Sequence, residues 1–429
     1  MEVRPGYKQT EVGVFPEEWE VKTLGSILSK GRLGGNYANQ DAEAELPLMK
    51  MGNLARGYFD LSKVQFITPG VRPELPHQLV YGDVLFNTRN TLDLVGKVAI
   101  WRDELPVAYY NSNLMRLEFD PEQVCSNEYA NYALNTQGAV SRLRALATGT
   151  TSVAAIYTRD LMKLQVLVPP LPEQNAIATA LSDVDALLGW LDRLIAKKRD
   201  LKQAVMQQLL TGQTRLPGYY GEWELKALGD LGSTFGGLTG KTKADFGEGA
   251  GKYVTFMNVM SNVVIDCAIF ERVKVAPTES QNEVMKGDLL FNGSSETPEE
   301  VAMCAVLTTH VPNLFLNSFC FGFRFRDGAE ADGLFMAYYL RSREGRELMK
   351  SLAQGSTRYN LSKAALLKAP IRVPSLAEQT AIAAVLSDMD AELSALEARR
   401  DKTRDLKQVI MQELLSGKTR LVSTGGTHV

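Results

Sequence analysis

Residues 173–216 read EQNAIATALSDVDALLGWLDRLIAKKRDLKQAVMQQLLTGQTRL, and residues 378–421 read EQTAIAAVLSDMDAELSALEARRDKTRDLKQVIMQELLSGKTRL. The two stretches lie 205 residues apart, and weaker similarity continues into the segments before them. There YGDVLFN at 81–87 matches KGDLLFN at 286–292, and EEWEVKTLG at 17–25 matches GEWELKALG at 221–229. Two copies of this length account for nearly all of the 429 residues. The chain is therefore an internal duplication.

The repeated stretch predicts one long helix in each copy. Its apolar residues alternate in spacings of four and three, which is typical of a coiled-coil seam. In the first copy the predicted seam comprises Ile177, Leu181, Val184, Leu188, Leu191, Ile195, Val205 and Leu209, and in the second Ile382, Leu386, Met389, Leu393, Leu396, Ile410 and Leu414. Gly212 and Gly417 stand where the helices would end. Each helix is then about 40 residues, or roughly 60 Å, long.

A helix of that length needs a partner, and the nearest partner is the other copy. We predict an intramolecular coiled coil, with two separate surface helices as the alternative. Polar residues interrupt the two seams at matching depth, and such positions usually set register and orientation. They are Lys198 and Lys202 in the first seam and Arg400 and Lys407 in the second. Because the first helix must end where the second domain begins, the second helix is expected to return antiparallel, giving a pseudo-twofold molecule with a globular domain at each end of a rod.

The residues before each helix predict an α+β fold in which strands dominate. Short apolar runs such as DVLFN, KVAIW and FCFGFRF are bounded by Gly, Asn and Pro. Helical stretches are expected near 128–146 and 333–353, each before a G-[TS]-T turn. The predicted segments are globular domains over 1–168 and 217–373, long helices over 169–216 and 374–421, and a flexible tail over 422–429. The helices are nearly identical between copies and the domains share only a skeleton. The helices are therefore expected to do one job twice, and the domains to do similar jobs on different targets.

Composition limits the function classes. The 47 basic and 50 acidic side chains give a net charge of −3, so no basic tail holds nucleic acid by bulk charge. Four cysteines without a CxxC pair argue against a disulfide framework or a zinc site and favour a reducing compartment. MEVRPGYKQTEVG at the start has no apolar core, and no apolar run is long enough to span a bilayer. A cytoplasmic protein without membrane contact is expected.

No catalytic motif stands out. GGLTGKT at 236–242 resembles a phosphate loop, but GxxxxGK[ST] requires glycine at the position of Phe235. GxSxG, HExxH and dinucleotide fingerprints do not occur. A nucleotide-using enzyme built around 236–242 is one remaining hypothesis, and it would require ATP binding by the isolated chain. We predict no catalytic residues and no metal site.

Binding is the better-supported prediction. Two sites of one design, related by a pseudo-twofold, suit duplex DNA because protein twofolds map onto paired half-sites. Polar and basic side chains in or beside turns are the candidate DNA contacts, since such groups bind phosphates and read base edges. They are Asn53, Arg56, Asn87, Arg89, Asn90, Lys97 and Arg116 in the first domain, and Lys241, Lys243, Lys252, Asn258, Asn292, Arg358 and Lys363 in the second. Asn87-Thr88-Arg89 corresponds to Asn292-Gly293-Ser294, so a contact by Arg89 is not expected to carry over to the second domain.

The order of the motifs is specific. PEEWE…LG, then GD-[VL]-LFN, then G-[TS]-T, then PLPEQ or SLAEQ leading into a long helix, all twice over, resembles the specificity subunit of type I restriction–modification systems. The resemblance covers essentially the whole chain, and the repeated helices are its most diagnostic part. It implies two target recognition domains, each reading one half of a split double-stranded DNA sequence, and helices that space them.

The resemblance also implies partners. Two modification (methyltransferase) subunits dock on the helices, and restriction (endonuclease/translocase) subunits join that core in bacterial or archaeal host defence. The specificity subunit itself is implied to be non-catalytic and to need no cofactor, while its partners use S-adenosylmethionine, ATP and magnesium. The alternative from another class is a coiled-coil adaptor that joins two protein-interaction domains without binding DNA.

Overall fold

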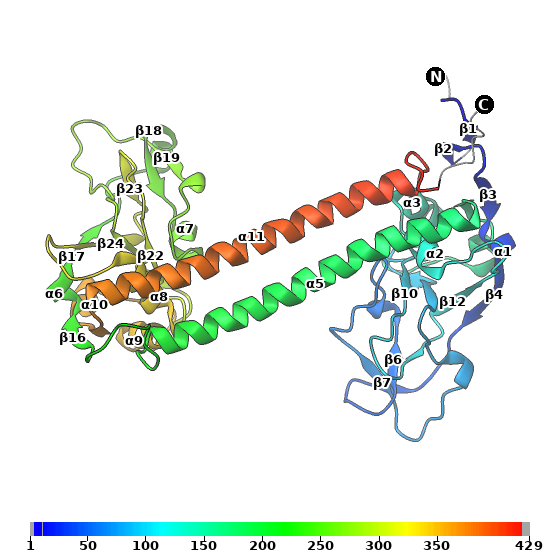
Figure 1. The fold of residues 1–429 in the computed structure, drawn as a ribbon, viewed down its shortest axis with the longest axis horizontal. Helices are drawn as coiled ribbons and strands as arrows, with labels where there is room; N and C mark the ends of the chain where they lie inside the picture. The colour runs from blue at the N-terminus through cyan, green and yellow to red at the C-terminus, as the bar shows by residue number, and fades with distance from the viewer. Residues whose placement is uncertain (1–3, 11, 423–429) are drawn as a thin grey trace. The chain divides into compact units, whose positions relative to one another are not determined.

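The computed structural model describes residues 4–10 and 12–422, so positions 423–429 of the predicted tail lie outside the described residues. The chain divides into two compact units, Met1–Leu191 with Arg399–Val429, and Asp192–Ala398. Each unit contains one mixed α/β domain, the beginning of one long helix and the end of the other (Figure 1). Helices that are both long and apolar enough to cross a membrane are absent from the described ranges.

The two long helices are α5 (Leu171–Leu209) and α11 (Leu376–Leu414), each of 39 residues. The predicted segment boundaries lie two residues before their starts. Gly212 and Gly417 have positive φ values of 71° and 69° just after the helices end, which is the usual place for glycine. The helical prediction for the repeated stretch is confirmed.

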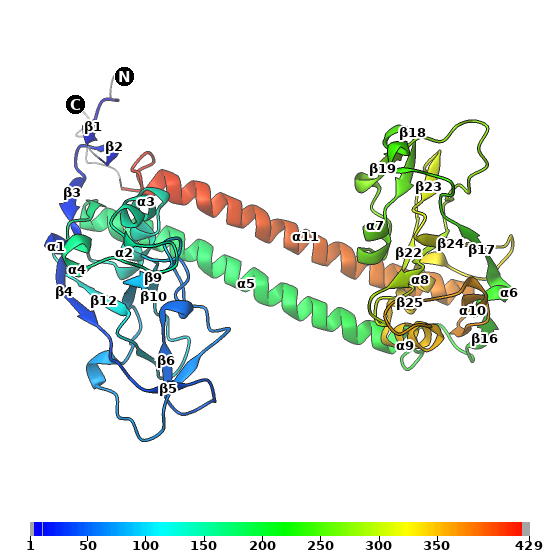
Figure 2. The same cartoon turned by 180° about the vertical axis from the view of Figure 1, so that it is seen from behind.

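The helices pack antiparallel within each unit, as both ribbon views show (Figures 1 and 2). In the first unit Ile177 and Leu181, near the start of α5, share a buried cluster with Leu414 at the end of α11. In the second unit Leu209, at the end of α5, lies in one cluster with Ile382. None of the predicted seam residues is exposed. The predicted antiparallel coiled coil is confirmed within each unit.

The first domain is built around a four-stranded antiparallel sheet whose two faces are both buried. Its strands, in the order β10-β8-β12-β4, are β10 (Val98–Ile100), β8 (Val84–Asn87), β12 (Leu114–Phe119) and β4 (Leu28–Leu33). Along β8, Val84 and Phe86 enter one buried cluster and Leu85 enters another. Because successive side chains of a strand alternate between faces, one strand serves two cores.

Smaller elements cover this sheet. A second sheet, β11-β6-β7-β5, is formed by β5 (Asn39–Gln40), β6 (Pro47–Met49), β7 (Gln65–Ile67) and β11 (Tyr109–Tyr110). A third comprises β9 (Arg89–Asn90), β13 (Thr148–Gly149) and β14 (Ala154–Ala155). The remaining elements are β1 (Tyr7–Thr10) with β2 (Gly13–Pro16), β3 (Glu20–Thr23) with β15 (Gln165–Val168), α1 (Leu24–Ile27), α2 (Asn127–Leu134), α3 (Gln137–Ala145) and α4 (Thr158–Leu161).

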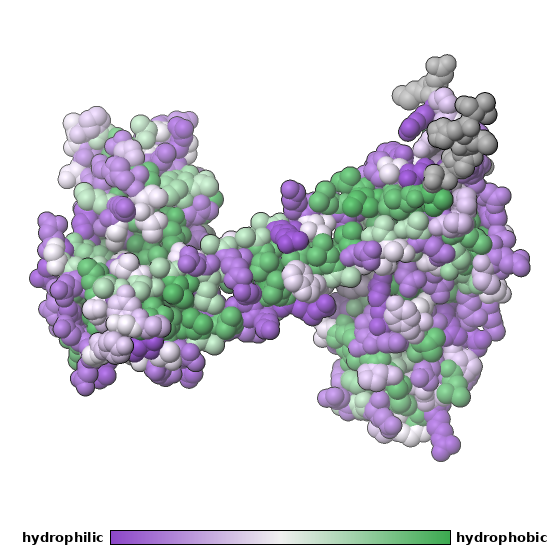
Figure 3. Space-filling view, viewed as in Figure 1, coloured by the Kyte–Doolittle hydropathy of each residue, from purple (hydrophilic) through white to green (hydrophobic). Residues whose placement is uncertain are grey.

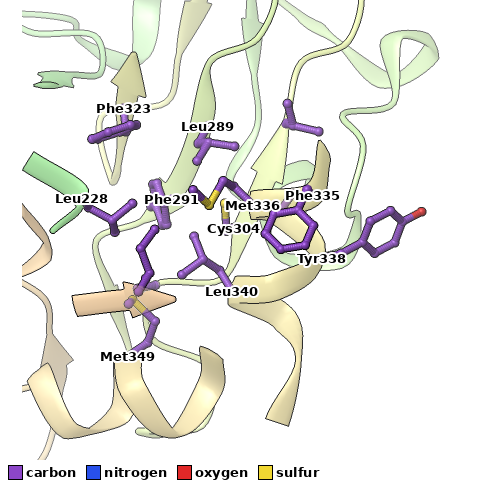
Figure 4. Close-up of a cluster of buried hydrophobic side chains, with 14 of the residues drawn as sticks. Leu228, Leu289, Phe291, Cys304, Phe323, Phe335, Met336, Tyr338, Leu340 and Met349 are labelled. Carbon is purple, nitrogen blue, oxygen red and sulfur yellow. The ribbon is translucent and has the colours of Figure 1, made fainter. Parts of the chain in front are cut away.

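The second domain repeats this plan. Its central sheet has the order β17-β24-β20-β22, with β17 (Gly232–Gly236), β24 (Cys320–Phe325), β20 (Leu289–Asn292) and β22 (Cys304–Val306). The other strands are β16 (Glu224–Ala227), β18 (Phe246–Val254), β19 (Glu271–Val273), β21 (Ser294–Ser295), β23 (Leu314–Leu316), β25 (Tyr359–Asn360) and β26 (Pro370–Val373). The helices are α6 (Leu228–Leu231), α7 (Phe256–Ser261), α8 (Gly333–Arg341), α9 (Arg343–Leu352) and α10 (Lys363–Leu367). Figure 4 shows Leu289 and Phe291 of the sheet packed against Phe335 and Met336 of α8.

Each helical stretch predicted before the G-[TS]-T turn is divided in two, at Thr136 and at Ser342. The Thr136 hydroxyl accepts a hydrogen bond from the Ala139 amide, and the Ser342 hydroxyl accepts one from the Gly345 amide, both at 3.3 Å. These side chains cap the second helix of each pair, which explains why one continuous helix does not form.

Replacing Leu181 or Leu386 with glutamate is expected to destabilise the unit that contains it by several kcal/mol, because each leucine is 0% exposed and a buried carboxylate has no partner there. The measurement is chemical unfolding followed by circular dichroism. Leu187→Glu is the matched control, since Leu187 is 37% exposed on the same helix. Equal stability of the three variants would contradict the assignment of the seam.

Candidate nucleic-acid interface and helix junctions

Each domain is attached to the helix pair by one tyrosine, one aspartate and one lysine. In the first unit the Tyr132 hydroxyl of α2 donates to Asp185 of α5 at 2.6 Å, and Lys407 of α11 pairs with the other oxygen of Asp185 at 2.5 Å. The ammonium of Lys407 also lies 5.5 Å from the centre of the Tyr132 ring. Burial, followed by the hydrogen bond to Asp185, raises the pKa of Tyr132. The carboxylate therefore joins three separate elements.

The second unit contains the same arrangement with the roles of the two helices exchanged. The Tyr338 hydroxyl of α8 donates to Asp390 of α11 at 2.7 Å, and Lys202 of α5 pairs with Asp390. The Lys202 ammonium lies 5.5 Å from the centre of the Tyr338 ring. Lys202 and Lys407, which interrupt the apolar seams in the sequence, are thus each neutralised by the opposite helix.

A second set of contacts joins the start of each helix to the end of the other. Glu173, 1% exposed, accepts from Arg420 Nε at 2.5 Å and from the indole of Trp19 at 2.9 Å. In the second unit Glu378, 0% exposed, accepts from Arg215 Nε at 2.5 Å. The hydrogen bonds to these glutamates raise the pKa of both arginines. The E of each EQ motif is therefore bound to the R of the other copy's TRL motif.

The glutamine of each EQ motif holds the loop that enters the helix. Gln174, wholly buried, donates to the carbonyls of Gln123 and Pro169 at 2.9 Å and accepts from the Cys125 amide at 3.1 Å. Gln379 makes the equivalent bonds to the segment before α8 and to Pro374. Sequence reasoning recognised these motifs as diagnostic but missed what they do. The available signal was their identity in both copies at positions outside the apolar seam.

Four of the five asparagines predicted to contact DNA are buried instead. Asn53 is 4% exposed, and Asn87, Asn258 and Asn292 are 0% exposed. Their amides bond to backbone groups of neighbouring loops; Asn292, for example, donates to the Glu300 carbonyl at 2.9 Å and accepts from the Met303 amide at 2.6 Å. Their interpretation as DNA contacts is revised, because a buried amide with satisfied hydrogen bonds fixes a turn and does not face a ligand.

Two predicted cationic contacts are also occupied within the fold. Arg116 pairs with Asp83 at 3.1 Å and donates to the Pro76 and Gln78 carbonyls. The Lys241 side chain, 6% exposed, bonds to the Lys274 carbonyl and to Glu279, both at 2.5 Å. The structure gives both residues a role in holding loops.

Arg56 and Lys97 form a cationic group in the first domain. Burial and the charge of Arg144 lower the pKa of Arg56, while burial and the charge of Arg56 lower the pKa of Lys97. Nη1 of Arg56 is buried without a hydrogen-bond partner among the described residues. With Arg102, Arg56 also lines a hollow of about 630 Å³. Mutually repelling cations favour an incoming anion such as a phosphate.

The remaining candidates lie at the surface. Arg89 in the first domain and Lys243, Lys252, Arg358 and Lys363 in the second are exposed, and Asn90 is partly buried. Arg358 Nε donates to the Ser294 hydroxyl at 3.1 Å. Their contact with DNA stays a prediction. The structure brings the Arg358 side chain to the place that corresponds to Arg89, although Arg89 lies on β9 and Arg358 lies in the hairpin turn before β25.

Comparison with known proteins agrees with this architecture. Residues 16–197 and 220–403 both match the family model for the type I restriction modification DNA specificity domain. The chain is 24% identical to a protein of Methanocaldococcus jannaschii described as the MjaX type I restriction enzyme specificity subunit, over 97% of each chain. It is 21% identical to the MjaVIII specificity subunit of the same organism, over 95% of this chain and 94% of the relative. The crystal structure of a type I restriction–modification S subunit from M. genitalium has the same fold, with a TM-score of 0.56, 17% identity, and coverage of 96% of this chain and 98% of that one.

The two matches to the specificity domain together cover most of the chain. The chain therefore belongs to the type I restriction–modification specificity subunit family, and its two domains are DNA specificity domains. The resemblance seen in the sequence motifs is confirmed.

Arg215→Ala is expected to lower the free energy of opening at the start of α11 by about 2–4 kcal/mol, because it leaves the buried Glu378 without its cation. Arg420→Ala should cost less at the start of α5, because Glu173 keeps the Trp19 indole. Hydrogen exchange of the amides at 171–181 and 376–386 measures both effects. The control is Arg404→Ala, whose side chain is 53% exposed and which should change opening by less than about 0.5 kcal/mol. An unchanged exchange rate in Arg215→Ala would contradict the role of this pair.

Proposed function

We propose that this chain gives a type I restriction–modification complex its sequence specificity, with each domain recognising one half of a bipartite double-stranded DNA target. The observation that carries the proposal is the uneven duplication. The helices and most of their junction contacts recur in both copies, including the tyrosine, aspartate and lysine that join each domain to the helix pair. The two domains share a sheet order and differ in their exposed side chains. A protein that presents two different half-site readers to one duplex needs this combination.

The proposal includes two modification (methyltransferase) subunits that dock on the helix pair, with restriction (endonuclease/translocase) subunits joining that core. Exposed apolar side chains on the helices support docking, because a large apolar residue at the surface marks a contact site when it belongs to a patch. In the first unit the most exposed of these are Trp190, 47% exposed, on α5, and Leu406 and Val409, 50% and 57% exposed, on α11. Figure 3 shows hydrophobic surface over this end of α11.

The chain itself is proposed to catalyse nothing. S-adenosylmethionine, ATP and magnesium would be used by the partner subunits in the bacterial or archaeal cytoplasm. Groups of three or more histidine, cysteine, aspartate or glutamate side chains with metal-binding geometry do not occur in residues 4–10 and 12–422. The two cysteines in the core, Cys304 and Cys320, have their pKa raised to about 12 by burial, which makes them poor nucleophiles.

Replacing residues 217–373 with the second recognition domain of another family member should change one half of the methylated sequence and leave the other half intact. The reason is that each domain has its own buried core and its own junction to the helices. Methylation-site mapping of DNA from cells that express the chimaera with its modification subunits is the measurement. A simultaneous change in both half-sites would contradict independent recognition.

The alternative, a coiled-coil adaptor without DNA affinity, predicts a different salt response. A complex that contacts phosphates through this chain loses affinity steeply as salt rises, since counterions are released on binding. Arg56→Ala should make the slope of log affinity against log salt concentration shallower by about one unit or less, because one phosphate contact is lost. Equal affinity of the complete complex for DNA that carries the target sequence and for random DNA would favour the adaptor.

A further inference from the structure

The small sheet β9-β14-β13 of the first domain has one inward and one outward face. Ala154 and Ile156 point inward and are 0% and 2% exposed. Strand alternation therefore places Val153, Ala155 and Tyr157 outward, and Val153 and Tyr157 are 69% and 57% exposed. The paired residues of neighbouring strands share a face. Ala155 pairs with Arg89 on one side and with Thr148 on the other.

The second domain repeats this sheet with the same pairing. Ser294 of β21 pairs with Asn360 of β25, and Asn360 forms a bridge with Gln354. Leu361, 5% exposed, points inward in the place of Ile156. The Leu361 amide donates to the Gly293 carbonyl at 3.2 Å, as the Ile156 amide donates to the Thr88 carbonyl at 3.0 Å.

The frame of this sheet is fixed by residues that both copies share. Gly149 and Gly355 turn the hairpin with φ values of 129° and 128°, and a Cβ atom on either would lie within 2.3 Å of a carbonyl across the turn. Only glycine fits there. The buried Asn87 accepts from the Arg89 amide at 3.2 Å, and Asn292 donates to the Ser294 carbonyl at 3.1 Å. Each asparagine therefore holds the backbone of the strand that carries Arg89 or Ser294.

The outward positions, in contrast, all differ between the copies. Thr148, Val153, Ala155, Tyr157 and Arg89 of the first domain correspond to Gln354, Arg358, Asn360, Ser362 and Ser294 of the second. The inward positions are apolar in both copies, with Ala154 and Ile156 in the first domain and Tyr359 and Leu361 in the second. A frame that is kept while every outward side chain changes is expected of a surface that reads two different sequences.

We propose that the outward face of this small sheet reads base edges in each half-site, with Arg89 in the first domain and Arg358 in the second as its principal specificity-determining residues. The proposal rests on the proposed function and names the part of each domain that carries it. Arginine, asparagine and glutamine make bidentate hydrogen bonds to purine edges, and the major groove admits a narrow β-ribbon. The rest of the domain positions this ribbon.

The positive charge is supplied from different backbone positions in the two domains. In the first it comes from Arg89 on β9; in the second Ser294 occupies that position, and Arg358 reaches it from the hairpin to donate to the Ser294 hydroxyl. The basic residue is therefore lost at the position of Arg89 itself, and Arg358 supplies a guanidinium to this face from the hairpin. An arginine that approaches from the hairpin turn presents its guanidinium at another angle, which is expected to select another base or another position.

The test exchanges the two arrangements without changing net charge. Ser294→Arg with Arg358→Val gives the second domain the arginine position of the first, and Arg89→Ser with Val153→Arg does the reverse. Each double variant is purified with its modification subunits and assayed for methylation of a random-sequence library. We expect the preferred bases to change only in the half-site of the altered domain, with affinity for the original target reduced about 5- to 150-fold and affinity for random DNA within about twofold.

Arg72→Ala and Arg372→Ala, which remove exposed arginines of the same two domains outside this face, are the controls and should leave both half-sites unchanged. If the double variants keep both half-site preferences and full affinity, the small sheet does not read bases. If the double variants no longer assemble with the modification subunits, and any complex that still forms keeps the original base preference, the face is a protein contact and the proposal is overturned. Asn360→Ala, at a single exposed side chain, provides the same readout should a double variant fail to fold. Failure of the proposed function is distinguishable, because the unaltered complex would then show no sequence preference at all.

Discussion

The structure depends on buried carboxylates that find their cations in the other copy of the repeat. Glu173 and Glu378 lie at the starts of the long helices with almost no exposure, and each is paired with an arginine that follows the end of the opposite helix. A buried carboxylate without a partner is costly, so neither helix start is stable unless the opposite helix end is present. The two copies are therefore mutually dependent, even though each domain has its own core.

This dependence explains which parts of the duplication stay alike. Asp185 and Lys202 lie on the same helix but serve different units. Asp185 bonds to Lys407 of α11 and to Tyr132 of its domain, whereas Lys202 pairs with Asp390 of α11 and lies over the Tyr338 ring of the other domain. A change in either residue would need matching changes in a helix and in a domain. The outward side chains of the small sheets have fewer partners, since most of them are exposed and their hydrogen bonds stay within the sheet or cap the next helix. Constant helices and divergent domain surfaces follow from the number of partners that each residue must satisfy.

Much of the fold was predictable because its signals are local. The spacing of apolar residues predicted the helices and their seam, and the connection between the copies predicted the antiparallel direction. The junctions were not predictable, since Glu173 and Arg420 are separated by 247 residues and only the fold brings them together. The candidate DNA contacts were selected by residue type in or beside turns, and several of these side chains instead form hydrogen bonds within the fold. Asparagine side chains often bond to nearby backbone groups, as Asn258 of α7 and Asn292 at the end of β20 do.

The two domains also show why residues matched by position need not do the same work. In the first domain Arg116 pairs with Asp83, whereas in the second the strand register places Gly322 at the position of Arg116. The Phe235 ring covers that glycine, and Arg324, two residues further along the same strand face, lies 4.9 Å from the ring centre and pairs with Asp288 at 2.7 Å. The ion pair is kept although its arginine has moved. Arg89 and Arg358 follow the same rule at the surface. What the duplication preserves is the place where a charge is needed, and the sheet offers more than one backbone position from which a long side chain reaches that place.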